Sequence, residues 1–118
     1  MTERVIGLAI EVHRYLGPGL LESAYEECPG FELAQAGIEH RRQVALPVAH
    51  KDVRLDCGYR MDIAAERRLI IEVKAVERGL PIHEAQILTY LRLSRLRVAL
   101  LINFNTALLK NGLRRFVL

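Results

Sequence analysis

The sequence lacks any long apolar segment. No apolar run approaches the roughly 18 to 20 residues that a membrane-spanning helix needs. The N-terminal residues, MTERVIGLAIEVHR, place an acid and a base ahead of an interrupted apolar stretch, which is not the pattern of a signal peptide. We therefore expect a cytoplasmic protein with no membrane contact.

Cysteine is also scarce. Cys28 and Cys57 lie far apart and form no CxxC pair, which argues against a structural zinc site or a disulfide framework and favours two reduced, partly buried thiols. Internal repeats, low-complexity tracts and linkers are absent as well. With 118 residues, of which 51% are hydrophobic and 26% charged, the chain is expected to form a single domain over residues 1–118.

Lysine is rare among the basic residues. Of the 17 basic residues only Lys51, Lys74 and Lys110 are lysine, and the formal net charge is +3. An arginine-rich, mildly basic chain suits a polyanionic partner because arginine neutralises phosphates. Many proteins with no nucleic-acid role have the same balance, so charge alone does not identify the partner.

The apolar periodicity predicts two helices, three strands, a helix and two strands. The first helix covers residues 4–16 and ends at Gly17-Pro18-Gly19, and the second ends at Gly37 with a kink or break at Pro29-Gly30. The remaining elements are strands at 40–48, 54–63 and 69–76, a loop at 79–81, a helix at 82–93, and strands at 97–102 and 113–117. This ααβββαββ order predicts a mixed α/β sheet with flanking helices.

The third predicted strand is apolar except for Glu72 and Lys74. Residues two apart in a strand project from the same face, so these two side chains are neighbours. Asp62 can reach the same place if its strand forms a hairpin with this one. Two carboxylates and a lysine suit a hard divalent cation and a water. The spacing fits a structural Glu–Lys ion pair equally well, with Asp62 as a strand-end residue.

Three ordered segments carry a family resemblance: GYRMD (58–62), IIEVKAVE (70–77) and HEAQILTY (83–90). Together they resemble the PD-(D/E)xK nuclease superfamily, in which an Asp and an ExK on adjacent strands bind the metal. Asp62 matches the Asp, and Glu72-Val73-Lys74 matches the ExK. Gln86 and Tyr90 match the QxxxY element of RecB-like nucleases and share one helix face, which His83 can join. Without that match, Gln86 fits a solvent-facing helix former, and Tyr90 fits a half-buried aromatic of the core.

A second motif resembles a narrower family. Gly19, Glu22 and Tyr25 in GLLESAY reproduce the motif that names the GxxExxY protein family, and RRQVALPV, HEAQILTYL and LLINFN fit its further hallmarks. The resemblance implies that Glu22 directs its carboxylate at the metal, although the helix dipole alone would also favour a first-turn glutamate. Tyr25 is expected to pack or to hydrogen-bond within the site. Pro29-Gly30 departs from the family pattern, and a break there would tilt Glu22 away.

The resemblance implies a restriction-endonuclease-like fold and hydrolysis of nucleic-acid phosphodiesters with Mg²⁺ or Mn²⁺. Asp62, Glu72, the Val73 carbonyl and Glu22 would hold the metal, and Lys74, Gln86 and Tyr90 would complete the catalytic site. The same fold also hosts inactive members. A catalytically silent nucleic-acid-binding or regulatory module and a dimerisation scaffold therefore remain alternatives. A homodimer is expected if both strands of a duplex are cut.

Overall fold

The computed structural model describes residues 1–77 and 80–118. The helices are α1 (Thr2–Leu16), α2 (Glu22–Gln35), α3 (Pro81–Ser94) and a short 3₁₀ helix, η1 (Leu109–Gly112). The strands are β1 (His40–Ala45), β2 (Val48–His50), β3 (Val53–Leu55), β4 (Arg60–Ala65), β5 (Leu69–Lys74), β6 (Val98–Asn103) and β7 (Leu113–Val117). Gly79, in the predicted loop 79–81, lies outside the described residues. None of the helices in the described ranges has the length and hydropathy of a membrane span.

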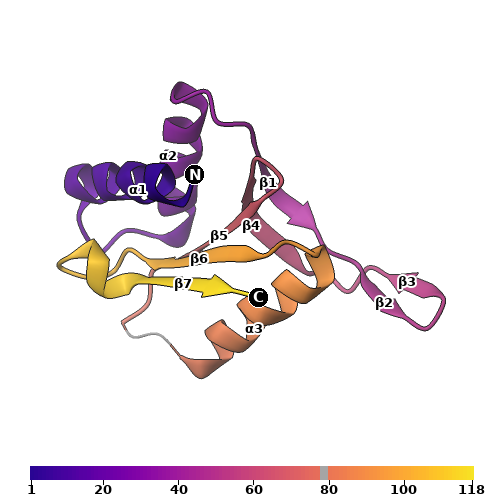
Figure 1. Cartoon of the computed structure of the whole chain (residues 1–118). Coiled ribbons are helices and arrows are strands. Elements are labelled where there is room, and N and C mark those ends of the chain that lie inside the picture. Colours follow the sequence, from indigo (N-terminus) through magenta and orange to yellow (C-terminus); the bar gives the residue numbers. More distant parts are fainter. Residues whose placement is uncertain (78–79) are drawn as a thin grey trace.

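Five strands form one mixed sheet in the order β1-β4-β5-β6-β7. Only β5 and β6 are parallel, and α3 makes the crossover between them. Helices α1 and α2 cover one face of this sheet and α3 covers the other (Figure 1). The structure thus confirms the predicted α/β class, a mixed sheet with flanking helices of restriction-endonuclease-like type.

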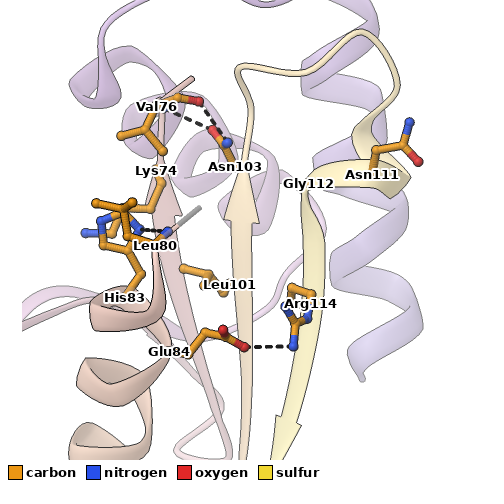
Figure 2. A pocket seen from close by; sticks show the side chains of 10 residues that line it. All are labelled: Lys74, Val76, Leu80, His83, Glu84, Leu101, Asn103, Asn111, Gly112 and Arg114. Atoms are coloured by element: carbon orange, nitrogen blue, oxygen red, sulfur yellow. Dashed lines mark hydrogen bonds and ion pairs between the residues drawn. The ribbon is translucent and has the colours of Figure 1, made fainter. Parts of the chain in front are cut away.

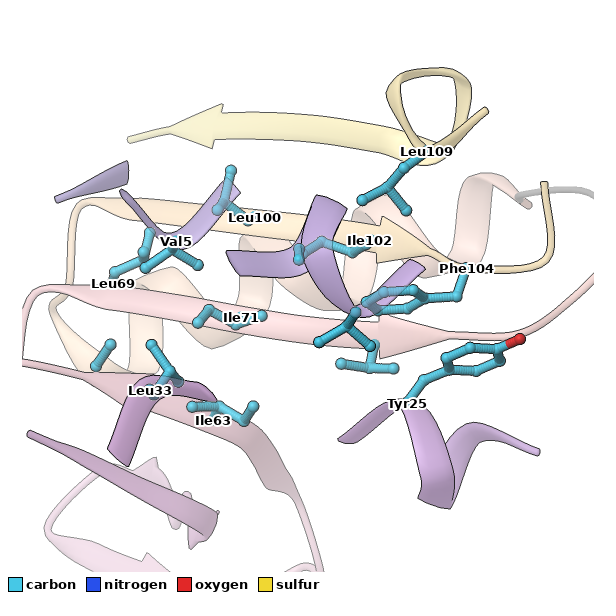
Figure 3. Close-up of a cluster of buried hydrophobic side chains, with 14 of the residues drawn as sticks. Val5, Tyr25, Leu33, Ile63, Leu69, Ile71, Leu100, Ile102, Phe104 and Leu109 are labelled. Atoms are coloured by element: carbon cyan, nitrogen blue, oxygen red, sulfur yellow. The ribbon is translucent and has the colours of Figure 1, made fainter. Parts of the chain in front are cut away.

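The two faces of the sheet have separate hydrophobic cores. On the α1/α2 side, Ile71 and Val73 of β5 pack with Leu33 and Phe104 (Figure 3). On the α3 side, Ile70 of the same strand packs with residues of α3. Alternate residues of β5 therefore serve opposite cores, and the even-numbered positions are the ones that face α3.

The predicted strands 40–48 and 54–63 are each divided in the structure. Strand β1 ends at Ala45, and β2 and β3 pair with each other as a hairpin that projects beyond the main sheet (Figure 1). Pro47 lies between β1 and β2 and has no N–H for a ladder, and Gly58 turns the chain before β4 with a φ of 81°. The predicted order of elements is correct for the strands of the five-stranded sheet. The prediction did not include the β2–β3 hairpin.

Helix α2 passes through Pro29-Gly30 without the predicted break. Pro29 and Gly30 are both buried, and Leu33, one turn further on, is part of the core. This packing offsets the backbone hydrogen bond that proline cannot make. A Cβ at Gly30 would lie 3.2 Å from Cδ of Arg42, so glycine leaves room for Arg42 to cross the helix.

Candidate active site

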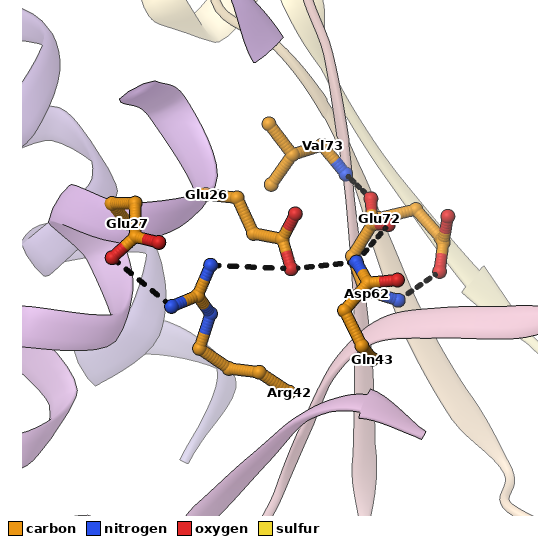
Figure 4. Close-up of polar contacts among 7 residues, drawn as sticks. All are labelled: Glu26, Glu27, Arg42, Gln43, Asp62, Glu72 and Val73. Carbon is orange, nitrogen blue, oxygen red and sulfur yellow. Dashed lines mark hydrogen bonds and ion pairs between the residues drawn. The ribbon is translucent and has the colours of Figure 1, made fainter. Parts of the chain in front are cut away.

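Strands β4 and β5 stop pairing at the point where Asp62 and Glu72 lie. The last ladder pair is Ile63 with Ile71. Beyond it, the Asp62 N–H donates to Oε1 of Glu72 (2.8 Å), and the Val73 N–H donates to Oδ2 of Asp62 (2.8 Å) (Figure 4). Each carboxylate therefore takes the place of a backbone carbonyl in the ladder. These two bonds hold the acidic side chains next to each other.

Burial makes ionisation of this carboxyl pair costly. Glu72 is 4% exposed, and desolvation together with the charge of Asp62 raises its pKa to about 8. Desolvation also raises the pKa of Asp62, although the Val73 N–H and the charge of Lys74 oppose the rise. At neutral pH the pair thus retains a proton that an exposed pair would lose. A cation between the two carboxylates would offset their mutual repulsion, and the pair would then release this proton.

Lys74 lies on the same strand face as Glu72 and interacts electrostatically with both carboxyl groups. Its positive charge lowers the pKa of Asp62 and of Glu72. The structure thus brings together the three residues on which the sequence-based hypothesis depends. Their placement agrees with the strand alternation, since position 74 faces α3 as position 72 does.

A hollow of about 500 Å³ lies between Lys74 of the sheet and residues 82–90 of α3. Lys74, His83, Gln86 and Tyr90 line it, so the QxxxY pair does face the lysine. Tyr90 is almost fully buried, and desolvation followed by the charges of Glu72 and Asp62 raises its pKa to about 12. Its hydroxyl is therefore near the carboxyl pair and stays protonated at any physiological pH. The ring of Tyr59 meets that of Tyr90 edge-on, with centroids 6.2 Å apart.

A second hollow, of about 240 Å³, adjoins the first and shares Lys74 and His83 with it (Figure 2). Asn103 lines it, and its amide group exchanges two hydrogen bonds with the backbone of Val76, at 3.1 and 2.9 Å. This clamp fixes the chain just after β5. Across the hollow Glu84 and Arg114 form an ion pair of 2.7 Å that links α3 to β7.

Glu22 lies at the start of α2 with its side chain exposed. Its charge is felt by Asp62, whose pKa it raises as the smallest of several causes. Within residues 1–77 and 80–118, no group of three or more His, Cys, Asp or Glu side chains is arranged to hold a metal ion. Asp62 and Glu72 are thus a two-carboxylate set, and Glu22 does not join them as a third ligand in this geometry.

The Tyr of the GxxExxY pattern is a structural residue. Tyr25 is fully buried, and its ring stacks on Phe104 at 4.7 Å. Its hydroxyl donates to the Gly17 carbonyl and accepts the Leu20 N–H (3.1 Å). Gly19, between these two residues, has a φ of 101°, which an L side chain rarely adopts. Two motif positions therefore shape the loop before α2, on which the position of Glu22 depends.

The sequence did not single out Gln43, which contacts Asp62, or Glu26, which contacts Gln43. Gln43 places Nε2 2.8 Å from Oε1 of Glu26 and 3.5 Å from Oδ1 of Asp62 (Figure 4). Arg42 forms ion pairs with Glu26 (3.5 Å) and Glu27 (3.1 Å). Glu26 could have been found, because it lies four residues after Glu22 on one helix face. Gln43 could not, because its position opposite Asp62 depends on the strand register.

Comparison with known proteins gives one match. A family model described as "PD-(D/E)XK nuclease superfamily" matches residues 1–116. No curated protein and no solved structure matches the chain. The family match covers every element from α1 to β6 and all but the last residue of β7.

Proposed function

We propose that this chain, which belongs to the PD-(D/E)XK nuclease superfamily, is a metal-dependent nuclease that hydrolyses phosphodiester bonds in nucleic acid. Nucleases of this superfamily typically use divalent metal ions. The observation that carries the proposal is the pair of buried Glu72 and half-buried Asp62 at the point where β4 and β5 separate. Lys74 lies on the same strand face as Glu72 and lines the hollow in front of α3.

The donor set suits Mg²⁺ or Mn²⁺. Asp62 and Glu72 supply anionic oxygens, and we assign the Val73 carbonyl and Glu22 as further ligands, Glu22 after a change of side-chain rotamer. Mg²⁺ is often bound through one or two carboxylates, with waters and substrate phosphates filling the other positions, so a two-carboxylate set is sufficient. When bound, such an ion neutralises charge on the phosphate and lowers the pKa of a bound water.

Lys74, Gln86 and Tyr90 act on the substrate in this proposal. The Lys74 ammonium orients the attacking water or neutralises the scissile phosphate. Tyr90, with a pKa of about 12, serves as a hydrogen-bond donor and not as a base. Gln86 lines the same hollow and offers an amide to a phosphate oxygen.

A nucleic-acid strand that passes Lys74 would occupy both hollows, since Lys74 and His83 border each of them. Cleavage of both strands of a duplex would require a second copy of the chain, because one centre cuts one strand. We further assign the chain to the GxxExxY family, on the grounds that the positive φ of Gly19 and the two hydrogen bonds of the Tyr25 hydroxyl shape the loop before α2.

The test is a cleavage screen over single- and double-stranded DNA and RNA with Mn²⁺. The wild type and Glu11→Gln, a matched change at an exposed glutamate of α1, should cleave at least one substrate. Glu72→Gln and Asp62→Asn should lose about 100-fold or more, because each removes one anionic ligand.

Two results would overturn the proposal. Salt-sensitive binding of nucleic acid without metal binding or cleavage would identify a catalytically silent binding module. Salt-insensitive self-association with no affinity for polynucleotide would identify a scaffold. Calorimetric titration of Mn²⁺ distinguishes these outcomes independently of any substrate.

A further inference from the structure

Gln43 has an unusual backbone for a residue within a strand. Its φ is +51°, in the left-handed region that L residues other than Asn, Asp and Gly seldom occupy. The flanking pairs, Arg42 with Ile63 and Val44 with Met61, keep one continuous register, so no extra residue is inserted here. That register places Gln43 opposite Asp62. Such strained conformations persist where the surroundings hold them, and they cluster at functional sites.

The side chain of Gln43 connects two acidic groups from different elements. Its Nε2 has two hydrogens, and the two acceptors within reach are Oε1 of Glu26 on α2 and Oδ1 of Asp62 on β4, at 2.8 and 3.5 Å. The Glu26 side chain is only 14% exposed, and it also forms an ion pair with Arg42 (Figure 4). The amide therefore lies between two carboxylates that would otherwise repel each other.

We propose that Gln43 is a positioning residue for the metal ligand Asp62. The inference rests on the metal centre proposed above. The Val73 N–H holds Oδ2 of Asp62 and the Gln43 amide holds Oδ1, so the carboxylate plane is fixed from both sides. Each oxygen keeps a lone pair for a cation. Glu26 anchors the Gln43 amide, and in this way α2 sets the orientation of a ligand on β4.

The experiment measures Mn²⁺ affinity by calorimetry on Gln43→Gly. Glycine adopts a φ of +51° without strain, so this variant removes the amide and preserves the backbone. Arg67→Gly is the matched control. Arg67 also has a positive φ (55°), in the β4–β5 turn at the far end of the strands from Asp62, and its side chain is 84% exposed.

We expect the Kd for Mn²⁺ to rise about tenfold in Gln43→Gly and to be unchanged in Arg67→Gly, since groups that orient metal ligands contribute on this scale. Both variants relieve a positive φ, but only Gln43→Gly also removes the bridge between Glu26 and Asp62, so its melting temperature should fall further than that of Arg67→Gly. The Kd therefore decides between the two roles. A purely structural role for Gln43 would lower its melting temperature and leave the Kd unchanged.

The outcomes separate this inference from the proposed function. Equal Mn²⁺ affinity in the wild type and Gln43→Gly overturns the role of Gln43 and leaves the metal centre intact. Absence of Mn²⁺ binding by the wild type overturns the metal centre itself and the inference with it. Weaker Mn²⁺ binding in Gln43→Gly, with unchanged binding in Arg67→Gly, supports both the metal centre and the positioning role of Gln43.

Discussion

Replacing Glu72 by glutamine should stabilise the metal-free protein above neutral pH. Folding raises the pKa of Glu72 from 4.5 to about 8, chiefly by desolvation and then by the charge of Asp62. Glutamine has no charge to bury and keeps an oxygen in the place of Oε1, which accepts the Asp62 N–H. The substitution thus removes the cost of ionisation and retains the backbone contact.

The sign and size follow from proton linkage. Below pH 4.5 the carboxyl is protonated in both folded and unfolded chains, and Glu72 adds no pH-dependent cost. Between 4.5 and about 8 the unfolded chain releases the proton while the folded chain holds it, so stability falls as pH rises. Each pH unit removes about 1.4 kcal/mol, so the loss across the whole window is on the order of 5 kcal/mol.

The assay is urea unfolding in EDTA at a series of pH values from 4 to 9. The free energies of the wild type and Glu72→Gln should agree near pH 4 and diverge to several kcal/mol by pH 8 to 9. Glu11→Gln, on the exposed face of α1, should follow the wild type throughout. Parallel curves for the wild type and Glu72→Gln would refute the claim that this carboxyl is desolvated and coupled to its neighbour.

Four other changes have definite expected outcomes. Lys74→Met should reduce cleavage about 100-fold in a Mn²⁺ nuclease assay, because it removes the charge beside the carboxyl pair, whereas Lys110→Met should not. Tyr25→Phe should cost about 1 to 2 kcal/mol in urea unfolding, since its buried hydroxyl makes two hydrogen bonds to the loop before α2. Gly112→Ala should cost several kcal/mol, because its Cβ would lie 2.1 Å from a backbone oxygen at the end of β6. Gly7→Ala, in open space on α1, should instead stabilise by up to about 1 kcal/mol.

The main sheet and the carboxyl pair could be predicted from the sequence because both depend on short-range periodicity. The alternation in β5 places Glu72 and Lys74 on one face whatever the rest of the fold does. A hairpin through the β4–β5 turn then brings Asp62 within reach. The i, i+4 spacing of Gln86 and Tyr90 likewise required only that residues 82–93 be helical.

The features that could not be predicted depend on contacts between distant segments. The cost of Pro29 inside α2 is local and visible in the sequence, but the packing that offsets it involves a sheet formed by later residues. The β2–β3 hairpin interrupts what reads as two long strands, because alternation continues across Pro47. The bridge from Gln43 to Asp62 exists only in the folded register.

The contacts that hold the carboxyl pair explain why the fold and the proposed metal centre depend on each other. Asp62 and Glu72 complete the β4–β5 ladder with their side chains, so neither can be removed without leaving a backbone N–H unpaired. The same burial that satisfies those N–H groups makes a second negative charge expensive. A proton at low pH and a divalent cation at high pH are two ways to relieve one electrostatic cost. The strand separation therefore accounts for the structural role of the two carboxylates and for the affinity for a cation that we propose for them.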